Sequence, residues 1–494
     1  MKKLISVLSA TVLLMTAAFS VSAAKLPAAV SSGVTVERID FNDPGFLRGM
    51  DVSSVLSLER SGVSFCGSDG EEEDIFKILA DNGVNAIRVR VWNEPETADG
   101  RSYGGGACDL ASACEIGERA ARYGLKLLVD FHYSDFWADP AKQKAPKAWA
   151  DMGVEEKCSA VETFTLQSLN AIRSAGGDVY MVQIGNETTS GIAGVNDFSA
   201  MPRIFGAGAA AVRAFDPDVL VALHFTDPQK TETMKWFADW LDENSVDYDV
   251  FASSYYPNWH GSLENLTEVL GYAARRYGKY AMVAETSYPY TLADSDGHPN
   301  TINASTGLSG DMLWDFTPQG QADELSAVMR AVNAVPDGRG LGVFWWEGAW
   351  ITVGDTTGLG GAEYDARLAQ NRLLWERYGS GWAASACCEY DPDDAGLWYG
   401  GSAVDNQAFF DPSGRALPSL SVFGDVLTGS YSGEALRGDV NGDGRVNIVD
   451  ATAIQRICAG LDQPDSRASM LADFDGSGAI DVVDATRLQV WLVS

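Results

Sequence analysis

Two glutamates stand at the ends of apolar, strand-like stretches that are far apart in the chain. "MVQIGNETTS" carries Glu187 directly after Asn186, and "AMVAETSYPY" carries Glu285. A carboxylic acid that protonates a leaving oxygen and a second carboxylate that attacks the anomeric carbon are the pair of groups that hydrolyses glycosidic bonds. Either glutamate alone is more simply explained as a salt-bridged loop acid, so the matched positions of the two carry the prediction.

The elements that must position these glutamates recur between residues 76 and 347. A helix-like stretch is followed by a glycine or short turn and then by a β-branched run, as in "IFKILADNGVNAIRVRVW". With "FLRGMDVSS" near residue 47, the pattern gives eight candidate strands. Alternating strands and helices predict an α/β protein, and eight such units predict a (β/α)8 TIM barrel. The alternative is an open doubly wound sheet, but its GxGxxG signature after the first strand is absent.

The predicted strand ends are rich in acids, arginines, histidines and aromatic residues. In a (β/α)8 barrel these carboxyl ends line one face, where active sites lie. Glu187 and Glu285 end the fourth and seventh predicted strands, which places both at that face.

Several motifs together resemble one known family. "GMDVSS", "RVRVWN", "DFHYSDFWADP", "VQIGNE", "SYYPNWHG" and "ETSYPY" are similar to motifs of glycoside hydrolase family 53, the endo-β-1,4-galactanases of clan A, over roughly residues 45–425. The resemblance implies a retaining mechanism with Glu187 as acid/base and Glu285 as nucleophile, and no cofactor for catalysis. It also implies a substrate in the galactan or arabinogalactan side chains of pectin. Retention predicts carboxyl groups about 5–5.5 Å apart.

Two other functions are compatible with the sequence. A β-mannanase or cellulase of clan A would share Asn186 and both glutamates, and the aromatic residues of its subsites would distinguish it. A barrel that only binds glycan would keep the fold, although the presence of both carboxylates argues against it. The formal net charge of −32 disfavours nucleic acid and anionic membranes as partners, and it suits neutral polysaccharide and bound calcium.

Supporting roles follow from what each glutamate needs. A nucleophile must stay ionised, and a neighbouring cation favours that form. Arg88 and Arg90 alternate onto one strand face, and Arg90 lies nearer the active end, so Arg90 is predicted to contact Glu285. The alternative is that one of the two arginines pairs with a structural acid. Tyr256 is predicted to hydrogen-bond Glu285, as a strand-six tyrosine does in this clan, and Asn186 to bind the sugar 2-hydroxyl.

The predicted substrate contacts are polar and aromatic residues near the strand ends. Tryptophan faces stack on sugar rings, although packing explains each one as well. "WWEGAW" departs from the proline that usually follows this glutamate in the family, and Glu347 is interpreted as a substrate or structural contact rather than as catalytic. The set is Asp51, Trp92, His132, Asp135, Trp137, Trp259, His260, Trp345, Glu347 and Trp350.

The stretch "LADSDGHPNT" alternates groups that bind calcium. Asp294, Asp296 and Asn300 offer side-chain oxygens, and His298 offers its backbone carbonyl. A plain Asp/Gly surface turn is the simpler interpretation. Some members of the family hold a calcium ion in the loop after strand seven, so the resemblance favours one structural Ca2+ here, with distant ligands from Ser402 and Asp405.

Two tail stretches, "DVNGDGRVNIVDATAIQRI" and "DFDGSGAIDVVDATRLQVW", repeat one pattern. Each places acidic and amide residues at positions 1, 3, 5, 9 and 12 of an EF-hand-like loop, which predicts two calcium ions. The repeat resembles a type I dockerin, a small all-α module that docks enzymes onto a cohesin module of a scaffoldin; the alternative is a generic EF-hand pair. The predicted ligands are Asp439, Asn441, Asp443, Asn447 and Asp450, then Asp473, Asp475, Ser477, Asp481 and Asp484.

In a dockerin, the residues that open the helix after each loop meet the cohesin. Here these are predicted to be the identical pairs Ala451-Thr452 and Ala485-Thr486.

The resulting order of segments is a signal peptide at 1–24, a catalytic barrel at 25–425, a linker at 426–436 and a dockerin at 437–494. Lys2 and Lys3 precede an apolar run with small residues at its end, which is typical of a secretory signal; the alternative is a membrane anchor. A secreted, extracellular protein carried on a cell-surface cellulosome is therefore expected. The seven cysteines show no zinc spacing and leave disulfide pairing open.

Overall fold

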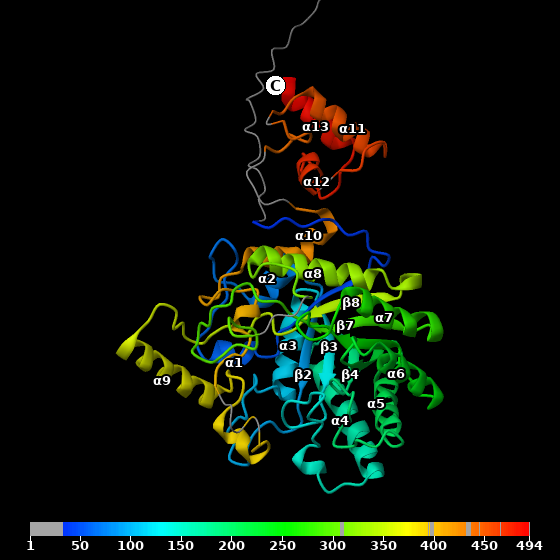
Figure 1. The fold of residues 1–494 in the computed structure, drawn as a ribbon, viewed down its shortest axis with the longest axis vertical. Coiled ribbons are helices and arrows are strands. Elements are labelled where there is room, and N and C mark those ends of the chain that lie inside the picture. Colours follow the sequence, from blue (N-terminus) through cyan, green and yellow to red (C-terminus); the bar gives the residue numbers. More distant parts are fainter. Residues whose placement is uncertain are drawn as a thin grey trace, which may run out of the picture. The chain divides into compact units, whose positions relative to one another are not determined.

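The computed structural model describes residues 33–306, 311–393, 395, 400–430, 436–443, 445–464 and 466–493. The predicted signal peptide at 1–24 lies outside these residues. The described chain divides into two compact units (Figure 1), one that ends at Ser430 and one that begins at Leu436.

The first unit is a closed barrel of eight parallel strands that pair in sequence order. Strand β1 pairs with β2 on one side and with β8 on the other, which closes the sheet. This confirms the predicted (β/α)8 fold. The strands are β1 Leu47–Asp51, β2 Ala86–Val91, β3 Lys126–Phe131, β4 Val179–Ile184, β5 Leu220–Phe225, β6 Val250–Ser254, β7 Tyr280–Thr286 and β8 Gly340–Trp345.

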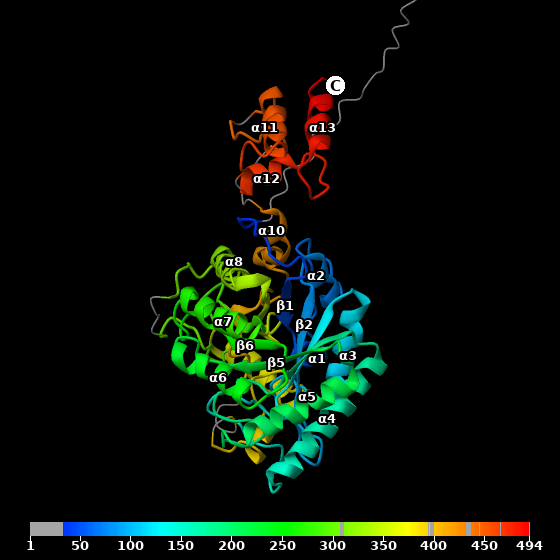
Figure 2. The ribbon, with the colours of Figure 1, turned by 90° about the vertical axis from the view of Figure 1, so that its right-hand side faces the viewer.

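Helices surround the strands (Figure 2) and cover their outer faces with apolar side chains. Short α1 Val55–Arg60 follows β1. The helices after it are α2 Ile75–Asp81, α3 Leu110–Arg122, α4 Val154–Ala175, α5 Met201–Phe215, α6 Thr231–Glu243, α7 Leu263–Tyr277, α8 Pro318–Asn333, α9 Gly361–Tyr378 and α10 Val422–Thr428.

The barrel interior changes in chemistry along the strands. A separate apolar cluster that includes Leu47, Met181 and Phe344 fills part of it. Gly49 is required there, because a Cβ on it would lie 2.2 Å from a ring carbon of Phe344. Nearer the strand ends the buried side chains become polar, beginning with Arg88. A packed floor therefore supports a polar layer at the carboxyl ends of the strands, where a (β/α)8 barrel carries its active site.

The catalytic unit extends beyond the predicted boundary at residue 425. Helix α10 continues to Thr428 and buries Val422, Phe423 and Val426. Ser430 then exchanges backbone hydrogen bonds with Val36. The Gly- and Ser-containing composition suggested a linker from 426, but burial of α10 against the barrel fixes this segment.

The second unit consists of α11 Ile448–Cys458, α12 Ser466–Ala472 and α13 Val482–Val493. It is all-α, as predicted. A small core that includes Ile454, Phe474 and Leu488 joins its helices. In α11 the Asn447 side chain accepts from the Val449 amide, and a capping box with Asp450 begins the helix.

The two predicted cohesin-contact pairs divide between core and surface. Ala451 and Ala485 are buried in the core, so the prediction that they meet a partner was wrong, whereas Thr452 and Thr486 are exposed. Helical periodicity turns the alanines toward the other helix. The exposed apolar side chains at the helix starts are instead Ile448 and Val449 of α11 and Val482 and Val483 of α13.

All seven cysteines lie in the described part of the chain, and each is a free thiol. Cys108 is buried beside Arg90, with its sulfur 3.5 Å from Nη2. Among the described helices, none has both the length and the apolar character needed to cross a bilayer.

Candidate active site

The two glutamates lie on the same cleft, which has a volume of about 330 Å³. Glu285 is in β7, and Glu187 follows β4 in a tight turn. The turn requires Gly185, whose φ is +81° and whose added Cβ would lie 2.4 Å from Thr188 Cγ2. Glu187 itself has a φ of +43°. The Thr188 amide, which donates to the His224 carbonyl across 2.8 Å, helps to hold this left-handed residue in place.

Glu285, the predicted nucleophile, is contacted by Arg88 and not by Arg90. Arg88 Nη2 donates to Glu285 Oε1 across 2.8 Å and to Asn186 Oδ1 across 2.9 Å. Arg90 instead donates to Glu347 Oε1 across 2.5 Å. The prediction for Arg90 was wrong because the position of a residue along a strand does not show which groups its side chain can reach. The long side chain of Arg88 spans the interior, whereas that of Arg90 turns toward the β1 and β8 ends.

Tyr256 makes the contact that the sequence predicted. Its hydroxyl donates to Glu285 Oε2 across 2.9 Å. Both oxygens of Glu285 therefore accept hydrogen bonds, one from a guanidinium and one from a phenol. Such donors stabilise an ionised carboxylate.

Glu187 has the opposite environment. Burial and, after it, the charge of Glu285 raise its pKa to about 8, although the hydroxyl of Ser254 opposes both effects. A carboxyl group with this pKa carries its proton at neutral pH. Two carboxyl groups in environments that favour different protonation states are the arrangement that acid and nucleophile roles require.

Asp51 and Glu347 do not line the cleft. Asp51 accepts from Arg88 across 2.8 Å and from Arg90 across 3.3 Å. Glu347 accepts from Ser54 across 2.7 Å in addition to Arg90. Both carboxylates are buried. The prediction that Asp51 contacts substrate was wrong, whereas Glu347 is a structural contact, which is one of the two roles predicted for it. Burial of a charge requires a partner, and the two arginines provide it.

Three of the predicted stacking tryptophans are core residues. Trp92, Trp345 and Trp350 are fully buried. Their indole N–H groups donate to His132 Nδ1, the Gln407 carbonyl and the Ser380 carbonyl, respectively. These three tryptophans therefore pack in the core, which was the alternative noted for each predicted tryptophan.

Four other tryptophans border the cleft. Trp137 and Trp259 were predicted, and Trp259 is 55% exposed. Trp346 and Trp382 were missed. Strand alternation offered a signal for Trp346, because Phe344 points into the barrel while Trp345 packs outward. Trp382 stacks on Trp137 at 4.7 Å from a distant segment, and no sequence signal placed it there.

Of the remaining polar residues that were predicted to contact substrate, two line the cleft and one does not. His132 and His260 line the cleft. His132 Nδ1 accepts from Trp92, and its Nε2 lies 3.1 Å from Asp130 Oδ2. Asp135 does not line the cleft, and the prediction that it binds sugar was wrong. Its oxygens accept from the backbone amides of Glu94 and Lys147 across 3.0 and 2.7 Å, so it joins loops.

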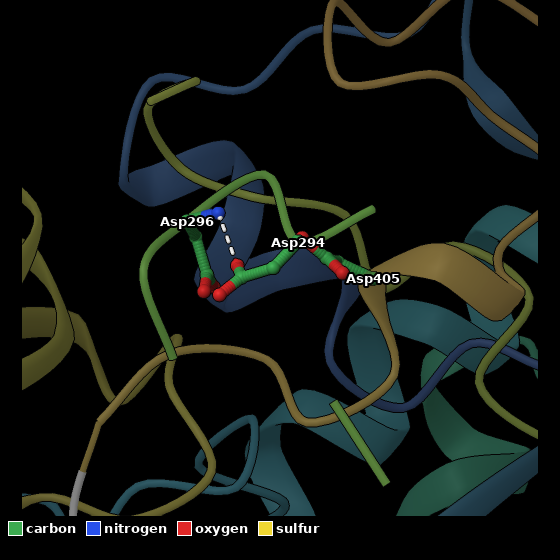
Figure 3. A group of neighbouring side chains, drawn as sticks. All are labelled: Asp294, Asp296 and Asp405. Carbon is green, nitrogen blue, oxygen red and sulfur yellow. Dashed lines mark hydrogen bonds between the residues drawn. The ribbon is translucent and has the colours of Figure 1, made fainter. Parts of the chain in front are cut away.

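The predicted barrel calcium ligands converge (Figure 3). Asp294, Asp296 and Asp405 each place one carboxylate oxygen within 4.8 Å of the others. Asn300 donates to Asp405 across 2.6 Å, while its own Oδ1 is buried without a partner. Burial raises the pKa of Asp405 to about 6 and that of Asp296 well above its usual range. Converging carboxylate oxygens, two of them from buried and mutually repulsive aspartates, fit a divalent cation.

Two further predicted ligands flank this cluster. The Ser402 amide donates to Asp296 Oδ2 across 2.7 Å, and its hydroxyl donates to the Trp350 carbonyl. The His298 amide donates to Asp296 Oδ1 across 2.8 Å. Ser402 comes from a distant segment, so the cluster ties the loop after β7 to the one before α10.

The two loops of the second unit fold alike. In the second loop, Asp473, Asp475 and Asp484 bring carboxylate oxygens within 4.8 Å. Asp484 accepts from the amides of Asp475 and Asp481. In the first loop, Asp450 accepts from the amides of Asn441 and Asn447 in the corresponding pattern. The predicted position-12 aspartates therefore close both loops.

The remaining predicted ligands of these loops also take part in their hydrogen bonding. Asp443 accepts from the Arg445 amide, Asp481 from Val483, and the Ser477 amide donates to Asp475. Asp439 lies 3.0 Å from Arg467 Nη2.

Comparisons with known proteins agree with this geometry. A model described as Glycosyl hydrolase family 53 matches residues 47–423, and one described as Dockerin type I domain matches 437–492. The chain is 52% identical over 389 residues to an endo-beta-1,4-galactanase of Bacillus subtilis (strain 168), with 78% of this chain and 87% of that relative covered. An arabinogalactan endo-beta-1,4-galactanase of Cellvibrio japonicus (strain Ueda107) is 31% identical over 322 residues, with 62% and 81% covered. The solved Ignisphaera aggregans GH53 catalytic domain has a TM-score of 0.68 at 33% identity, with 80% of this chain and 99% of that one covered.

Proposed function

The chain belongs to glycosyl hydrolase family 53 and contains a type I dockerin domain, and from this membership we propose that it cleaves β-1,4-galactosidic bonds inside galactan chains with retention of configuration. One observation carries the proposal. Two glutamates share one cleft, and the contacts of Glu285 favour a carboxylate while burial favours a protonated Glu187. The galactanase activity named for the relative that is 52% identical supports the substrate class.

In the proposed reaction, Glu285 attacks the anomeric carbon while Glu187 gives its proton to the departing glycosidic oxygen. Arg88 and Tyr256 hold the attacking carboxylate through the formation and breakdown of the ester. Ester formation removes the negative charge that helps to raise the pKa of Glu187. Glu187 then becomes a carboxylate that accepts a proton from the water attacking the ester, which regenerates both groups.

The proposed substrate is the neutral galactan or arabinogalactan side chain of pectin. A formal net charge of −32 disfavours the anionic pectin backbone and leaves neutral side chains as the accessible polymer. The exposed Trp259 and the partly exposed tryptophans of the cleft offer faces for sugar rings.

Release of reducing sugar from β-1,4-galactan, mannan, xylan and carboxymethylcellulose, measured side by side, tests the proposal. We expect release from galactan alone, with the β-anomer appearing first by NMR. Preference for mannan or carboxymethylcellulose would favour the clan A alternatives. Binding without hydrolysis of any polymer would favour a glycan-binding barrel.

The proposal includes secretion through residues 1–24 and docking onto a cohesin of a cellulosome. Ile448 and Val449 at the start of α11 match Val482 and Val483 at the start of α13, and all four are exposed. Each pair occupies positions 10 and 11 of its calcium-type loop, so either helix offers a similar apolar surface.

A pull-down against cohesins in calcium tests this docking. Changing one apolar pair to aspartates should leave binding largely intact, and changing both pairs should abolish it. Loss of binding with a single altered pair would contradict the two-fold mode. Lack of binding by the unaltered protein would contradict docking itself.

Three Ca2+ ions complete the proposal, two in the dockerin loops and one held by Asp294, Asp296 and Asp405 with Asn300. His298 and Ser402 are the further ligands expected from the sequence. The ion in the barrel would be structural, because it would join two loops and is not needed by either glutamate.

A further inference from the structure

Ser254, the last residue of β6, lies between a buried histidine and Glu187. Its hydroxyl donates to Glu187 Oε1 across 2.5 Å. His224 Nε2 lies 2.9 Å from the same hydroxyl oxygen. Ser254 and His224 are both fully buried. A side chain with no exposure and two polar contacts has a fixed orientation, so the hydroxyl is aimed at the carboxyl group.

The surroundings of His224 set the direction of this chain of hydrogen bonds. Nδ1 faces two donors, the Gln183 amide at 3.1 Å and the Glu187 backbone N–H at 3.4 Å. Asn186 Oδ1 is also 3.0 Å away, but it already accepts from Arg88 across 2.9 Å. Burial and the nearby charge of Arg88 lower the pKa of His224 well below its usual range. The ring is therefore neutral, with its proton on Nε2 facing Ser254.

We propose that Ser254 is a positioning residue that fixes the Glu187 carboxyl group and, with His224 behind it, sets the pH above which acid catalysis fails. This inference rests on the proposed function, because it assigns a role within the same reaction. A donor on Oε1 leaves the other oxygen to carry the proton that the leaving group needs. The same donor stabilises the carboxylate when Glu187 acts as base.

The charged and titratable groups around Glu187 come from every neighbouring element. Glu285 and Asp139 raise its pKa, while the hydroxyls of Ser254 and Thr226 lower it. Replacement of Ser254 removes an uncharged donor and leaves all charges in place. The groups that remain are Arg88, Arg90, His132, Asp139, His224, Asp227, Tyr256, His260 and Glu285.

The sign of the expected effect follows from the direction of the hydrogen bond. A hydroxyl that donates to a carboxylate favours the charged form, so its loss raises the pKa of Glu187. The enzyme is active while Glu187 is protonated. The alkaline limb of kcat/KM should therefore move upward in S254A, by about one pH unit for a single strong donor.

The test compares pH profiles of kcat/KM on galactan for wild type, S254A and S253A. Ser253 is the matched control, because it is equally buried on the same strand but its hydroxyl donates to the Ser254 carbonyl. We expect S254A to shift the alkaline limb upward and to lower kcat about ten-fold. We expect S253A to keep the limb of wild type. S254T, which keeps a hydroxyl, should restore the limb.

The outcomes separate this inference from the proposed function. If wild type does not hydrolyse galactan, the proposed function fails. If wild type is active and folded S254A keeps the wild-type limb, the role of Ser254 is overturned. Should S254A fail to fold, the nearly isosteric S254C replaces it. A thiol is a weaker donor, so an upward shift supports the role and an unmoved limb contradicts it.

Discussion

Two clusters of carboxylates in the barrel unit differ in the source of the positive charge that balances them. In the cleft, Arg88 lies 2.8 Å from Asp51, Asp130 and Glu285. Asp294 and Asp296 of the loop after β7 instead converge with Asp405, and burial together with the neighbouring carboxylates raises the pKa values of Asp296 and Asp405. A guanidinium on a strand is covalently fixed and always charged. We propose that the loop cluster instead takes its positive charge from a calcium ion, so its stability should vary with calcium concentration while that of the cleft should not.

The largest expected effect concerns the two glutamates of the cleft, Glu187 and Glu285. E285Q should lose at least about 10^4-fold in kcat/KM on galactan and on an activated aryl galactoside, because no covalent intermediate forms. E187Q should lose about 10^3-fold on galactan but far less on the aryl substrate, whose leaving group needs little protonation. Equal residual activity of the two variants on the aryl substrate would refute the assignment of roles.

The second effect asks whether Arg88 or Arg90 supports the nucleophile. R88A should reduce kcat about 10^2- to 10^3-fold, since it leaves Glu285 and Asp130 without their shared partner. R90A should mainly lower the melting temperature, because it leaves buried Glu347 unpaired. Steady-state kinetics and thermal unfolding of both variants provide the measurement. A larger kinetic loss in R90A would reverse the assignment made from the contacts.

The third effect tests the cluster of Asp294, Asp296 and Asp405 by replacing one carboxylate with an uncharged amide. D405N should raise the melting temperature in chelator, because it removes a buried, repelled carboxylate. In calcium it should lower the melting temperature by a few degrees, since a bound ion contributes about 2.7 kcal/mol at a hundred-fold excess over Kd.

The control for D405N is D355N, which changes an exposed aspartate that caps the Thr357 amide in the neighbouring loop. It should behave as wild type in both conditions. Identical melting curves of wild type with calcium and with chelator would end the idea of a barrel ion.

The smallest expected effect is the change in the initial rate on galactan when calcium is removed, and it separates catalysis from structural metal binding. Chelator should leave the initial rate on galactan at 25 °C within about two-fold of that in calcium, because the reacting groups are Glu187, Glu285 and Arg88 and not a metal. The same treatment should abolish cohesin capture, since metal supplies much of the folding energy of so small a module. A proportionate loss of both activities would contradict the separation of catalysis from bound calcium.

Local patterns predicted the framework well. Eight alternating βα units indicated the barrel, because helix and strand periods and turn glycines are written in neighbouring residues. The strand pattern placed Glu187 and Glu285 at strand ends, six motifs indicated the family, and a repeated loop pattern indicated the dockerin. The calcium-type spacing of Asp294, Asp296 and Asn300 is local as well, and the structure brings Asp405, which was predicted as a distant ligand, into the same cluster.

Details of the site depended on distances that the sequence does not contain. Arg88 and Arg90 share a strand face, but only the closed barrel shows that Arg88 spans the interior to Glu285. Trp345 and Trp346 are neighbours in sequence, yet one is core and the other borders the cleft.

The sequence by itself determined the fold class, the two-unit organisation, the identity of the two glutamates and the residues of the calcium-type loops. These are short-range properties, fixed by periodicity and by spacing within one segment. Only the tertiary structure decided which cation meets the nucleophile, which tryptophans face the cleft, that Trp382 joins them, and that Ser254 contacts Glu187. Each of these depends on side-chain reach across a barrel closed by strands far apart in the chain, and long-range packing alone sets that geometry.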